Sequence, residues 1–363
     1  MIENEYYGQL AHGPYEIFDI GDLVLEHGGT LRKCLLAYAT FGKLNEAKDN
    51  VILMPTWFAG TNKIMEQAYI GPGRALDPEK YFIVVVNQIG GGLSTSPHNT
   101  AYPLGMANFP KVTIGDDVAA QERLLRLHFG IEELALVVGG SMGAQQVYEW
   151  AVGFPDKVQR AAPIAGTAKT TPHDFLYVGV LADAIMSDPA WKGGWYSEAH
   201  TVREGLRRHS RLWALMGLSP GLLKAEFWRA LGFSSLDDFL LNFLDATFLP
   251  MDPNNLLCMA WKWQNVDVSR HTRGDLAAAL GGIKAKTTVM PISSDMFFVT
   301  ADCAAEQKLI PDSELKVLET AWGHIGLFGL DAHYVEQIDA ALSELLARPA
   351  PLPASGREFD DRK

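Results

Sequence analysis

The sequence has few cysteines, a deficit of positive charge and no long apolar run. Its 363 residues include only 3 cysteines, Cys34, Cys258 and Cys303, and none of them forms a C-x-x-C pair. An odd number of widely spaced cysteines predicts neither a disulfide framework nor a zinc site, and favours buried thiols in a reducing compartment. The N-terminus is acidic and shows no secretory signal, and no run of about 18 apolar residues is present to span a membrane. We therefore expect a cytoplasmic protein with no membrane partner.

Basic residues are outnumbered, with 31 Lys and Arg against 43 Asp and Glu, so the formal net charge is −12. A chain of this charge repels phosphate backbones, and no basic cluster longer than Arg207-Arg208 offsets the repulsion, so we expect no nucleic-acid partner. The motifs G-x-x-x-x-G-K-[ST] and H-E-x-x-H, and a G-x-G-x-x-G following a strand, are all missing, so the sequence predicts no metal and no cofactor. A hydrophobic content of 48% excludes a disordered chain and provides for a sizeable core.

Short apolar runs alternate with amphipathic stretches through much of the chain. The runs are typical of strands buried on both faces of a parallel sheet, and the amphipathic stretches are typical of helices. The predicted strands are two within 17–40, around a turn at 27–29, then 51–54, 81–86, 134–138, 287–290 and 315–318, and the predicted helices are 113–127, 144–151 and 334–346. This alternation predicts an α/β fold with a mostly parallel, doubly wound sheet.

The pattern changes in the middle of the chain. Residues 175–265 carry Leu, Met, Trp and Phe at helical spacing and show no strand-like run. We predict a helical insertion over residues 167–280, which forms a lid on a core made of residues 1–166 and 281–346, because a stretch of this length is too large for a loop. Residues 347–363 are rich in Pro, Gly and charge, and are predicted to be disordered.

The motif G-x-S-x-G directly follows the predicted strand 134–138, as Gly139-Gly140-Ser141-Met142-Gly143. A strand before it and a helix after it are the context of a nucleophile elbow, in which small residues allow a strained turn and the serine hydroxyl projects above the sheet. The amide of Met142 then points at a developing oxyanion from a helix N-terminus. The loop after strand 51–54 is expected to supply the second oxyanion donor, with the Phe58 amide preferred and Trp57 as the alternative.

A serine nucleophile needs a base, and a third group must orient that base. In this type of fold the chain order is serine, then acid, then histidine. His324 follows the last predicted strand and precedes the last helix, so it is the predicted base, whereas His333 is interpreted as a surface residue. Asp295 directly follows another strand and is the predicted acid, because its rivals Asp302 and Asp312 lie away from the strand end.

Several longer stretches are shared with a known family. They are residues 36–45, 70–77, 109–114, 138–146 and 149–151, together with Ser293-Ser294-Asp295 and Gly323-His324 at the positions of the acid and the histidine. Over roughly residues 15–345 the chain resembles the homoserine O-acetyltransferase group of the α/β-hydrolase superfamily. The resemblance implies an α/β-hydrolase fold with a helical lid, a serine that acetyl-CoA acetylates, transfer of the acetyl group to an alcohol, and a homodimer formed through the lid.

The departures from that family fall in the part that binds the substrate. The residue after the catalytic histidine is normally an aspartate near the amino group of homoserine, and here it is Ile325. A lid arginine survives one place late as Arg211, and Trp261 lies in a stretch that normally ends in Thr-Arg. The oxyanion loop, normally His-Ala-Leu, reads Thr56-Trp57-Phe58. We therefore predict Trp57, Trp261, Ile325 and Arg211 as substrate-binding residues.

These substitutions predict an apolar pocket and argue against homoserine, because a buried ammonium without a partner is costly. The aromatic residues behind this prediction are Trp57, Phe58, Trp261, Trp263 and Trp322. Two alternatives stay open: the aromatics only pack the lid onto the core, or a lid carboxylate, Asp267 or Glu226, replaces the missing aspartate.

The sequence thus predicts a serine acyl-transfer enzyme that forms an acyl-enzyme with a small-molecule acyl substrate. The first interpretation is hydrolysis of an ester, thioester or amide with an apolar or aromatic part. The second is an O-acetyltransferase that uses acyl-CoA and an alcohol other than homoserine. The third is a hydrolase-fold binding protein without catalysis. The first two differ in whether water or an alcohol removes the acyl group from the serine.

Overall fold

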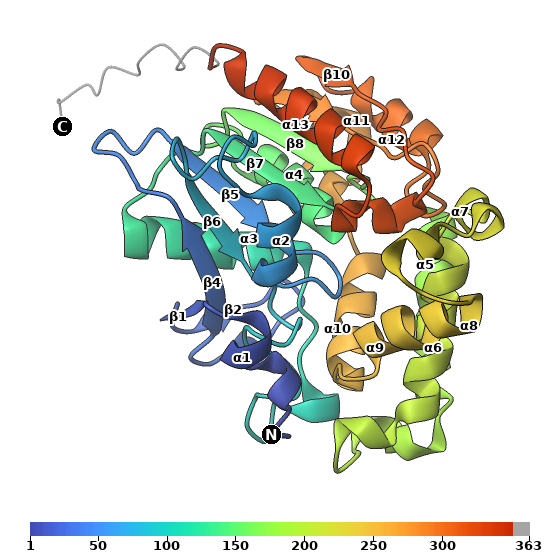
Figure 1. The fold of residues 1–363 in the computed structure, drawn as a ribbon. Helices are drawn as coiled ribbons and strands as arrows, with labels where there is room; N and C mark the ends of the chain where they lie inside the picture. Colours follow the sequence, from blue (N-terminus) through green and yellow to red (C-terminus); the bar gives the residue numbers. More distant parts are fainter. Residues whose placement is uncertain (351–363) are drawn as a thin grey trace.

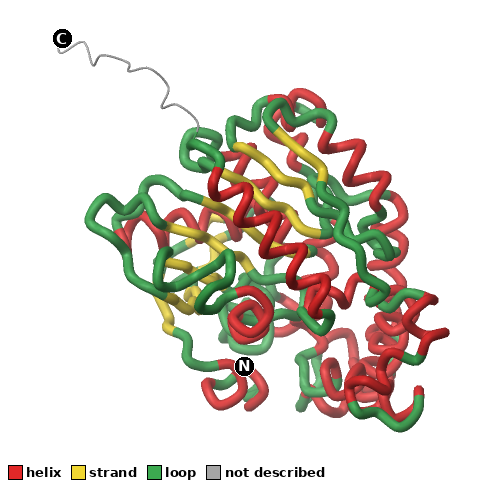
Figure 2. Tube along the Cα trace, turned by 45° about the horizontal axis from the view of Figure 1, so that its top comes forward, coloured by secondary structure: helices red, strands yellow, loops and turns green. Residues whose placement is uncertain are grey.

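The computed structural model describes residues 1–350, which form a central sheet with helices on both faces (Figures 1 and 2). Eight strands make up the main sheet in the order β1-β4-β6-β5-β7-β8-β9-β10, and β2 and β3 form a separate hairpin. The strands are β1 (Glu16–Asp19), β2 (Leu23–Val24), β3 (Thr30–Leu31), β4 (Leu35–Phe41), β5 (Val51–Pro55), β6 (Phe82–Val86), β7 (Leu136–Gly140), β8 (Arg160–Ile164), β9 (Lys286–Val289) and β10 (Ser313–Leu315).

All neighbouring strands from β6 to β10 are parallel, and only the β1–β4 and β4–β6 pairs are antiparallel. Every residue of β5, β6, β7 and β8 is buried, as expected of a parallel sheet covered on both faces. The predicted class, a mostly parallel doubly wound α/β fold, is confirmed.

The helices of the described chain divide between the two faces of the sheet and the insertion. They are α1 (Gln9–His12), α2 (Asn62–Tyr69), α3 (Ile114–Leu124), α4 (Met142–Gly153), α5 (Pro172–Met186), α6 (Arg203–Gly217), α7 (Pro220–Ala225), α8 (Leu236–Phe239), α9 (Ala246–Phe248), α10 (Pro253–Gln264), α11 (Leu276–Gly281), α12 (Thr300–Gln307) and α13 (Ala332–Ala347). Apolar residues of α2 and α13 pack on one face of the central strands, and those of α3 and α4 pack on the other. The sheet is therefore the middle of three layers (Figure 2).

Two parts of the strand prediction need correction. The segment 17–40 holds four strands instead of two: the predicted turn at 27–29 joins β2 to β3, and β1 pairs with β4 across this hairpin. Strand β8 was not predicted, because Arg160 and Pro163 interrupt its apolar pattern. The Arg160 guanidinium is accommodated by hydrogen bonds to the carbonyl oxygens of Ala135 and Arg348.

Between β8 and β9 the described residues form helices and turns, and no strand of the sheet. Of these helices, α5 to α10 gather at one side of the sheet, whereas α11 lies apart from them, near α12 (Figure 1). One apolar cluster runs from the core strands into them and includes Val86, Trp213 and Trp263. The insertion therefore has no core separate from that of the sheet.

The C-terminal part ends in α13, which stops at Ala347. The disorder predicted for 347–363 falls mostly on residues 351–363, which lie outside the described residues. Within residues 1–350, no helix combines the length and the apolar character needed to cross a membrane.

Candidate active site

Ser141 occupies a sharp turn between β7 and α4, with φ 54° and ψ −125°. A positive φ is strained for a residue with a side chain, and such strain concentrates at functional sites. The flanking glycines are required by close packing: a Cβ on Gly139 would come within 2.6 Å of the Gly143 carbonyl carbon, and one on Gly143 within 2.7 Å of the Pro55 oxygen. The G-x-S-x-G spacing therefore reflects how tightly α4 returns against β7 and the end of β5.

A row of hydrogen bonds joins Ser141, His324 and Asp295, which come from three separate parts of the chain. The Ser141 hydroxyl lies 2.9 Å from His324 Nε2, and His324 Nδ1 lies 2.7 Å from Asp295 Oδ2. An ionised carboxylate only accepts, so Nδ1 carries the proton and Nε2 is left to accept the serine proton. The other Asp295 oxygen accepts the Phe297 amide at 2.8 Å. All three side chains are buried.

The loops that carry the acid and the histidine are tied to each other. The Ser294 hydroxyl donates to the Thr320 carbonyl and accepts the Gly323 amide, which lies 3.1 Å away. Phe297 stands edge-on to the His324 ring, with 4.8 Å between the ring centroids and 75° between the planes. These contacts hold the imidazole in one orientation, as general base catalysis requires.

The backbone amides of Met142 and Phe58 were predicted to face an oxyanion. Within residues 1–350, neither amide donates a hydrogen bond to another part of the chain, and the same is true of Trp57, the alternative donor. Met142 is the first residue of α4, where the positive end of the helix dipole adds to the N–H groups. These amides are therefore available to stabilise negative charge beside Ser141.

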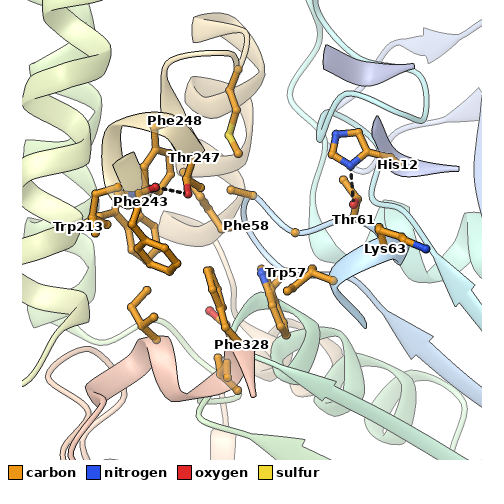
Figure 3. Close-up of a pocket in the computed structure, with 18 of the residues that line it drawn as sticks. His12, Trp57, Phe58, Thr61, Lys63, Trp213, Phe243, Thr247, Phe248 and Phe328 are labelled. Atoms are coloured by element: carbon orange, nitrogen blue, oxygen red, sulfur yellow. Dashed lines mark hydrogen bonds between the residues drawn. The ribbon is translucent and has the colours of Figure 1, made fainter. Parts of the chain in front are cut away.

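A cavity of about 350 Å³ opens beside Ser141 and His324 (Figure 3). Its walls are mainly aromatic and aliphatic, and its polar side chains besides Ser141 and His324 are few. The apolar wall comprises Trp57, Phe58, Trp213, Phe243, Phe248, Ile325, Leu327 and Phe328, and the polar lining comprises His12, Thr61, Lys63, Gln67 and Thr247, with Tyr6 from the N-terminal segment. Trp57 stacks on Phe328 with 5.8 Å between centroids and 3° between planes. This site suits an uncharged ligand.

Trp213 faces the cavity with its ring because its polar atom is used elsewhere. The indole N–H donates to Nε2 of His209 at 3.0 Å, and His209 Nδ1 bonds to the Leu181 carbonyl at 3.1 Å. Burial lowers the pKa of His209 to about 4, so the ring stays neutral and keeps Nε2 as an acceptor. The hydrogen bond is therefore hidden in the wall, and the cavity meets an apolar surface.

Two of the four predicted substrate-binding residues, Trp57 and Ile325, line this cavity, and two do not. Trp261 lies on the other side of α10, where Lys111 Nζ sits 5.2 Å above its ring and a separate cavity is formed. Its near neighbour Trp263 points inward instead and packs against Phe58 at 6.0 Å, since residues two apart on a helix face nearly opposite directions. The structure corrects the prediction for Trp261 accordingly.

Arg211 is also placed outside the cavity. Its Nη2 lies 3.1 Å from Asp245 Oδ2, and the Ser210 hydroxyl donates to the same carboxylate. Asp245 is completely buried, so its charge needs a cationic partner. Arg211 is thereby committed to a charge within the insertion, and the prediction that it contacts substrate is corrected.

Other residues were misplaced or missed by the sequence analysis. Trp322 packs near Phe227, away from the cavity, with 6.4 Å between ring centroids. Trp213, Phe243 and Phe248 were not predicted, although the apolar periodicity of the insertion places such residues on inward faces. Nothing in the sequence indicated the N-terminal contributors Tyr6 and His12. Among the described residues, no three His, Cys, Asp or Glu side chains gather where they could hold a metal ion.

Comparisons with known proteins agree with this geometry. A family model described as the alpha/beta hydrolase fold matches residues 49–329. The chain is 58% identical to the ethyl acetate hydrolase of Pseudomonas veronii over 347 residues, which cover 96% of this chain and 99% of that protein. The solved structure of an acetylester hydrolase from Corynebacterium glutamicum superposes with a TM-score of 0.95 at 59% identity, covering 96% of this chain and 100% of the other.

A homoserine O-acetyltransferase from Solidesulfovibrio magneticus is 31% identical over 369 residues, which cover 90% of this chain and 92% of that protein. The resemblance predicted from the sequence is confirmed by this match. The higher identity to proteins named as ester hydrolases places the chain nearer to them than to this acetyltransferase.

The hydrogen bonds that join Ser141, His324 and Asp295 predict that Ser141 is the reactive nucleophile. We expect a fluorophosphonate probe to add one adduct to the wild-type protein and none to Ser141→Ala, because Ser141 is the one serine of residues 1–350 with an imidazole 2.9 Å from its hydroxyl. Intact-mass spectrometry reads the adduct, and thermal unfolding checks that the variant is folded. Ser234→Ala, which removes an exposed serine, is the matched control and should label like the wild type. An adduct on Ser141→Ala contradicts the assignment.

The hydrogen bond between Ser141 and His324 also predicts that labelling by the fluorophosphonate probe slows as the pH falls. Protonated His324 cannot take the proton of Ser141, so the labelling rate should decline as the pH falls. His324→Ala should label at least about a hundredfold more slowly and lose this pH dependence. The labelling rate constant is measured against pH for both proteins. A flat profile in the wild type is the outcome that this prediction does not allow.

Proposed function

The chain belongs to the alpha/beta hydrolase fold family and is an enzyme of that family, and from this premise we propose that it hydrolyses small carboxylic esters, acetate esters above all. The observation that carries the proposal is the buried row of Ser141, His324 and Asp295 at the inner end of an apolar cavity. Relatives of 58% and 59% identity that cover nearly the whole chain are named as an ethyl acetate hydrolase and an acetylester hydrolase.

In the proposed mechanism, His324 Nε2 takes the proton as the Ser141 oxygen attacks the ester carbonyl. The negative oxygen of the tetrahedral intermediate accepts hydrogen bonds from the Met142 and Phe58 amides, and losing one such donor typically costs about 2.7–4 kcal/mol of transition-state stabilisation. Collapse of the intermediate releases the alcohol, which takes the proton from His324, and leaves an acyl group on Ser141. Water, deprotonated by His324, then attacks the acyl group; the acid leaves as the Ser141 oxygen takes the proton back from His324. Asp295 stabilises the imidazolium in both steps.

The cavity supports an uncharged substrate. Its one basic side chain besides histidine, Lys63, is half-buried at the lining and pairs with Glu66 at 2.9 Å. The two lid carboxylates considered as replacements for the family aspartate are used elsewhere: Asp267 pairs with Lys169, and Glu226 pairs with Arg229. The ammonium group of homoserine therefore has no carboxylate partner among the cavity residues.

An O-acetyltransferase with an uncharged alcohol acceptor is the second candidate. The match of 31% identity to a homoserine O-acetyltransferase favours it, and so does a cavity in which an apolar alcohol can compete with water. Acyl-CoA as the acyl donor belongs to this candidate only. A binding protein without catalysis is disfavoured by the complete hydrogen-bonded row.

We also propose that residues 167–280 act as the lid of this site and that the enzyme works in the cytoplasm. Helices of this segment supply Trp213 and Phe248 to the cavity wall, which supports the lid. Free cysteines, with Cys34 and Cys303 buried, support a reducing compartment.

A homodimer formed through the lid is proposed from the surface of α5. Four apolar side chains of this helix are exposed at helical spacing: Phe175 (55%), Leu176 (68%), Val180 (42%) and Met186 (40%). An apolar stripe of this kind on a soluble protein commonly marks a protein–protein interface. The occupant proposed here is the same stripe of a second copy, related by a two-fold axis.

Substrate preference tests the proposed function. We expect the wild type to hydrolyse ethyl acetate and 4-nitrophenyl acetate, and to acetylate L-homoserine from acetyl-CoA at least about a hundredfold less efficiently, since a missing charged hydrogen bond and an unpaired ammonium both oppose binding. Steady-state kcat/KM for each reaction is the measurement. Robust O-acetylhomoserine formation, with weak ester hydrolysis, rejects the esterase proposal in favour of the second candidate.

Ile325→Asp tests the apolar wall of the same cavity. We expect it to raise KM for ethyl acetate about tenfold or more, because a carboxylate then faces an apolar ligand, and not to create homoserine acetylation, because Arg211 stays paired with Asp245. Ile325→Leu is the matched control and should keep KM within about threefold, as volume-conserving apolar changes are tolerated. An unchanged KM in Ile325→Asp means that this wall does not contact the ester.

The dimer is tested by placing charge on the α5 stripe. We expect the wild type to run as a dimer in light scattering coupled to size exclusion, and Phe175→Glu/Val180→Glu to run as a monomer, because buried unpaired carboxylates oppose association. Leu127→Glu, at a residue 58% exposed outside the insertion, is the matched control and should stay dimeric. A monomeric wild type, or a dimeric double variant, rejects this interface.

A further inference from the structure

The carbonyl oxygen of Thr56 is held by two buried glutamine side chains. Thr56 begins the loop after β5 that carries Trp57 and Phe58. Gln88 Nε2 donates to this oxygen at 2.6 Å, and Gln146 Nε2 donates to it at 3.1 Å. Gln88 follows β6, whereas Gln146 lies on α4, so the carbonyl accepts hydrogen bonds from two separate parts of the fold. Both glutamines are at most 2% exposed, so no solvent competes for these bonds.

A relay of side chains fixes which end of the Gln146 amide faces the carbonyl. The indole N–H of Trp150 donates to Gln121 Oε1 at 2.8 Å, and Gln121 Nε2 donates to Gln146 Oε1 at 2.6 Å. An indole nitrogen is only a donor, so Gln121 must turn its oxygen toward Trp150 and its nitrogen toward Gln146. Gln146 then has to present its own nitrogen to Thr56. The Trp150 indole N–H, which can only donate, therefore determines the orientation of the Gln121 and Gln146 amides.

A second relay fixes the Gln88 amide in the same way. Lys262 of α10 is completely buried, and its ammonium pairs with Asp117 of α3 and donates to the Ile89 carbonyl at 2.7 Å. The same nitrogen lies 3.4 Å from Gln88 Oε1. An ammonium is only a donor, so the oxygen of Gln88 faces Lys262 and its nitrogen faces Thr56. The buried ion pair between Lys262 of the insertion and Asp117 of the core thus also determines which end of the Gln88 amide bonds to the Thr56 carbonyl.

We propose that Gln146 and Gln88 are positioning residues for the oxyanion donors, acting through the Thr56 carbonyl. The Thr56 carbonyl and the Trp57 amide belong to one planar peptide, so fixing the carbonyl fixes the direction of the Trp57 amide. The Phe58 amide belongs to the next peptide, which is joined to the first through φ and ψ of Trp57, so the carbonyl anchors the start of the segment that carries this donor. Gln146 lies on the helix whose first residue, Met142, supplies the other donor. We call the hydrogen bonds from Gln88 and Gln146 to the Thr56 carbonyl the clamp. The clamp therefore helps to set the separation between the two amides that face the oxyanion.

This inference rests on the proposed ester hydrolysis and adds to it a cause for the rigidity of the oxyanion site. Electrostatic stabilisation of a transition state depends on donors that are already oriented, because reorganising them during the reaction costs free energy. A clamp that acts only on these donors affects the intermediate more than the bound ester. The effect should therefore appear in kcat and leave KM largely unchanged.

The neighbouring residue Gln145 provides a matched control. It lies on the same helix and is also completely buried, but neither its amide oxygen nor its amide nitrogen has a hydrogen-bond partner among the described residues. Burial of an amide on α4 therefore does not by itself produce the clamp. Gln145→Met and Gln146→Met change the same atoms one position apart. The comparison therefore isolates the hydrogen bonds of the Gln146 amide, which besides those to Thr56 and Gln121 include one from Nε2 to the Met142 carbonyl at 3.3 Å.

The experiment measures kcat and KM for 4-nitrophenyl acetate in Gln146→Met, Gln88→Met and the double variant. We expect each single variant to lower kcat about 10- to 100-fold with KM within about threefold, which is less than the 10²–10³ lost when a donor itself is removed. The double variant should lose less than the product of the two single losses, because both glutamines act on one carbonyl. Gln145→Met should keep kcat within about twofold.

A transition-state analogue separates positioning from general damage. Affinity for an alkyl trifluoromethyl ketone, whose adduct with Ser141 carries an oxyanion, should fall in parallel with kcat across the series, whereas the acid-side pH dependence should stay that of the wild type because His324 is untouched. Gln146→Glu keeps the shape but turns an acceptor toward the carbonyl, so it should lose at least as much kcat as Gln146→Met. Thermal unfolding identifies variants that do not fold.

Defined results overturn the proposal. It fails if folded Gln146→Met and Gln88→Met keep kcat within about twofold, whether or not KM rises. It also fails if Gln145→Met lowers kcat as much as Gln146→Met does. If a glutamine variant does not fold, Trp150→Phe decides instead. It keeps Gln121, Gln146 and Gln88, removes the indole donor that orients Gln121 and Gln146, and should lower kcat about 2- to 10-fold at unchanged KM. A folded Trp150→Phe with wild-type kcat then overturns the proposal. A wild type without esterase activity rejects the proposed function itself, which is a separate result.

Discussion

The close return of α4 against the end of β7 is the constraint on which the rest of the site depends. Ser141 accepts a positive φ so that the chain can reverse there, and Gly139 and Gly143 lack a Cβ because backbone from α4 and from β5 fills that space. This contact places the N-terminus of α4, the serine hydroxyl and the loop after β5 beside one another. A larger residue at either glycine would push α4 away and separate the two sets of amide donors.

The apolar cavity is produced by pairing polar groups with one another behind its wall. Trp213 donates its indole N–H to His209, and Arg211 is bound to Asp245. Each of these side chains has a polar atom that would otherwise demand water or a charged ligand, because an unpaired polar group is costly to bury. With the Trp213 indole N–H and Arg211 Nη2 bound internally, the lining presents rings and methyl groups to the cavity. The lining of this cavity therefore contains no Asp or Glu among the described residues.

The helical insertion and the sheet are joined by apolar packing and by one buried charge pair. The cluster that includes Val86 and Trp263 is continuous between them, and Lys262 brings a charge from α10 to Asp117 in the core. Replacing such a pair by apolar residues is often neutral for stability, so its retention is better explained by geometry than by free energy. Here the ammonium also orients Gln88, which links the position of the insertion to the loop after β5 that carries Trp57 and Phe58.

The sequence alone determined the parts of this protein that follow from local patterns. Apolar runs identified the core strands other than β8, and the glycines around Ser141 identified the turn. Chain order selected His324 and Asp295, which the fold brings within hydrogen-bond distance. Tertiary structure decided the rest. Two residues on one helix, Trp261 and Trp263, carry the same side chain and differ only in the side they face, and the partner of Arg211 lies 34 positions away in Asp245. Direction and long-range pairing depend on how elements pack, and no local pattern encodes them.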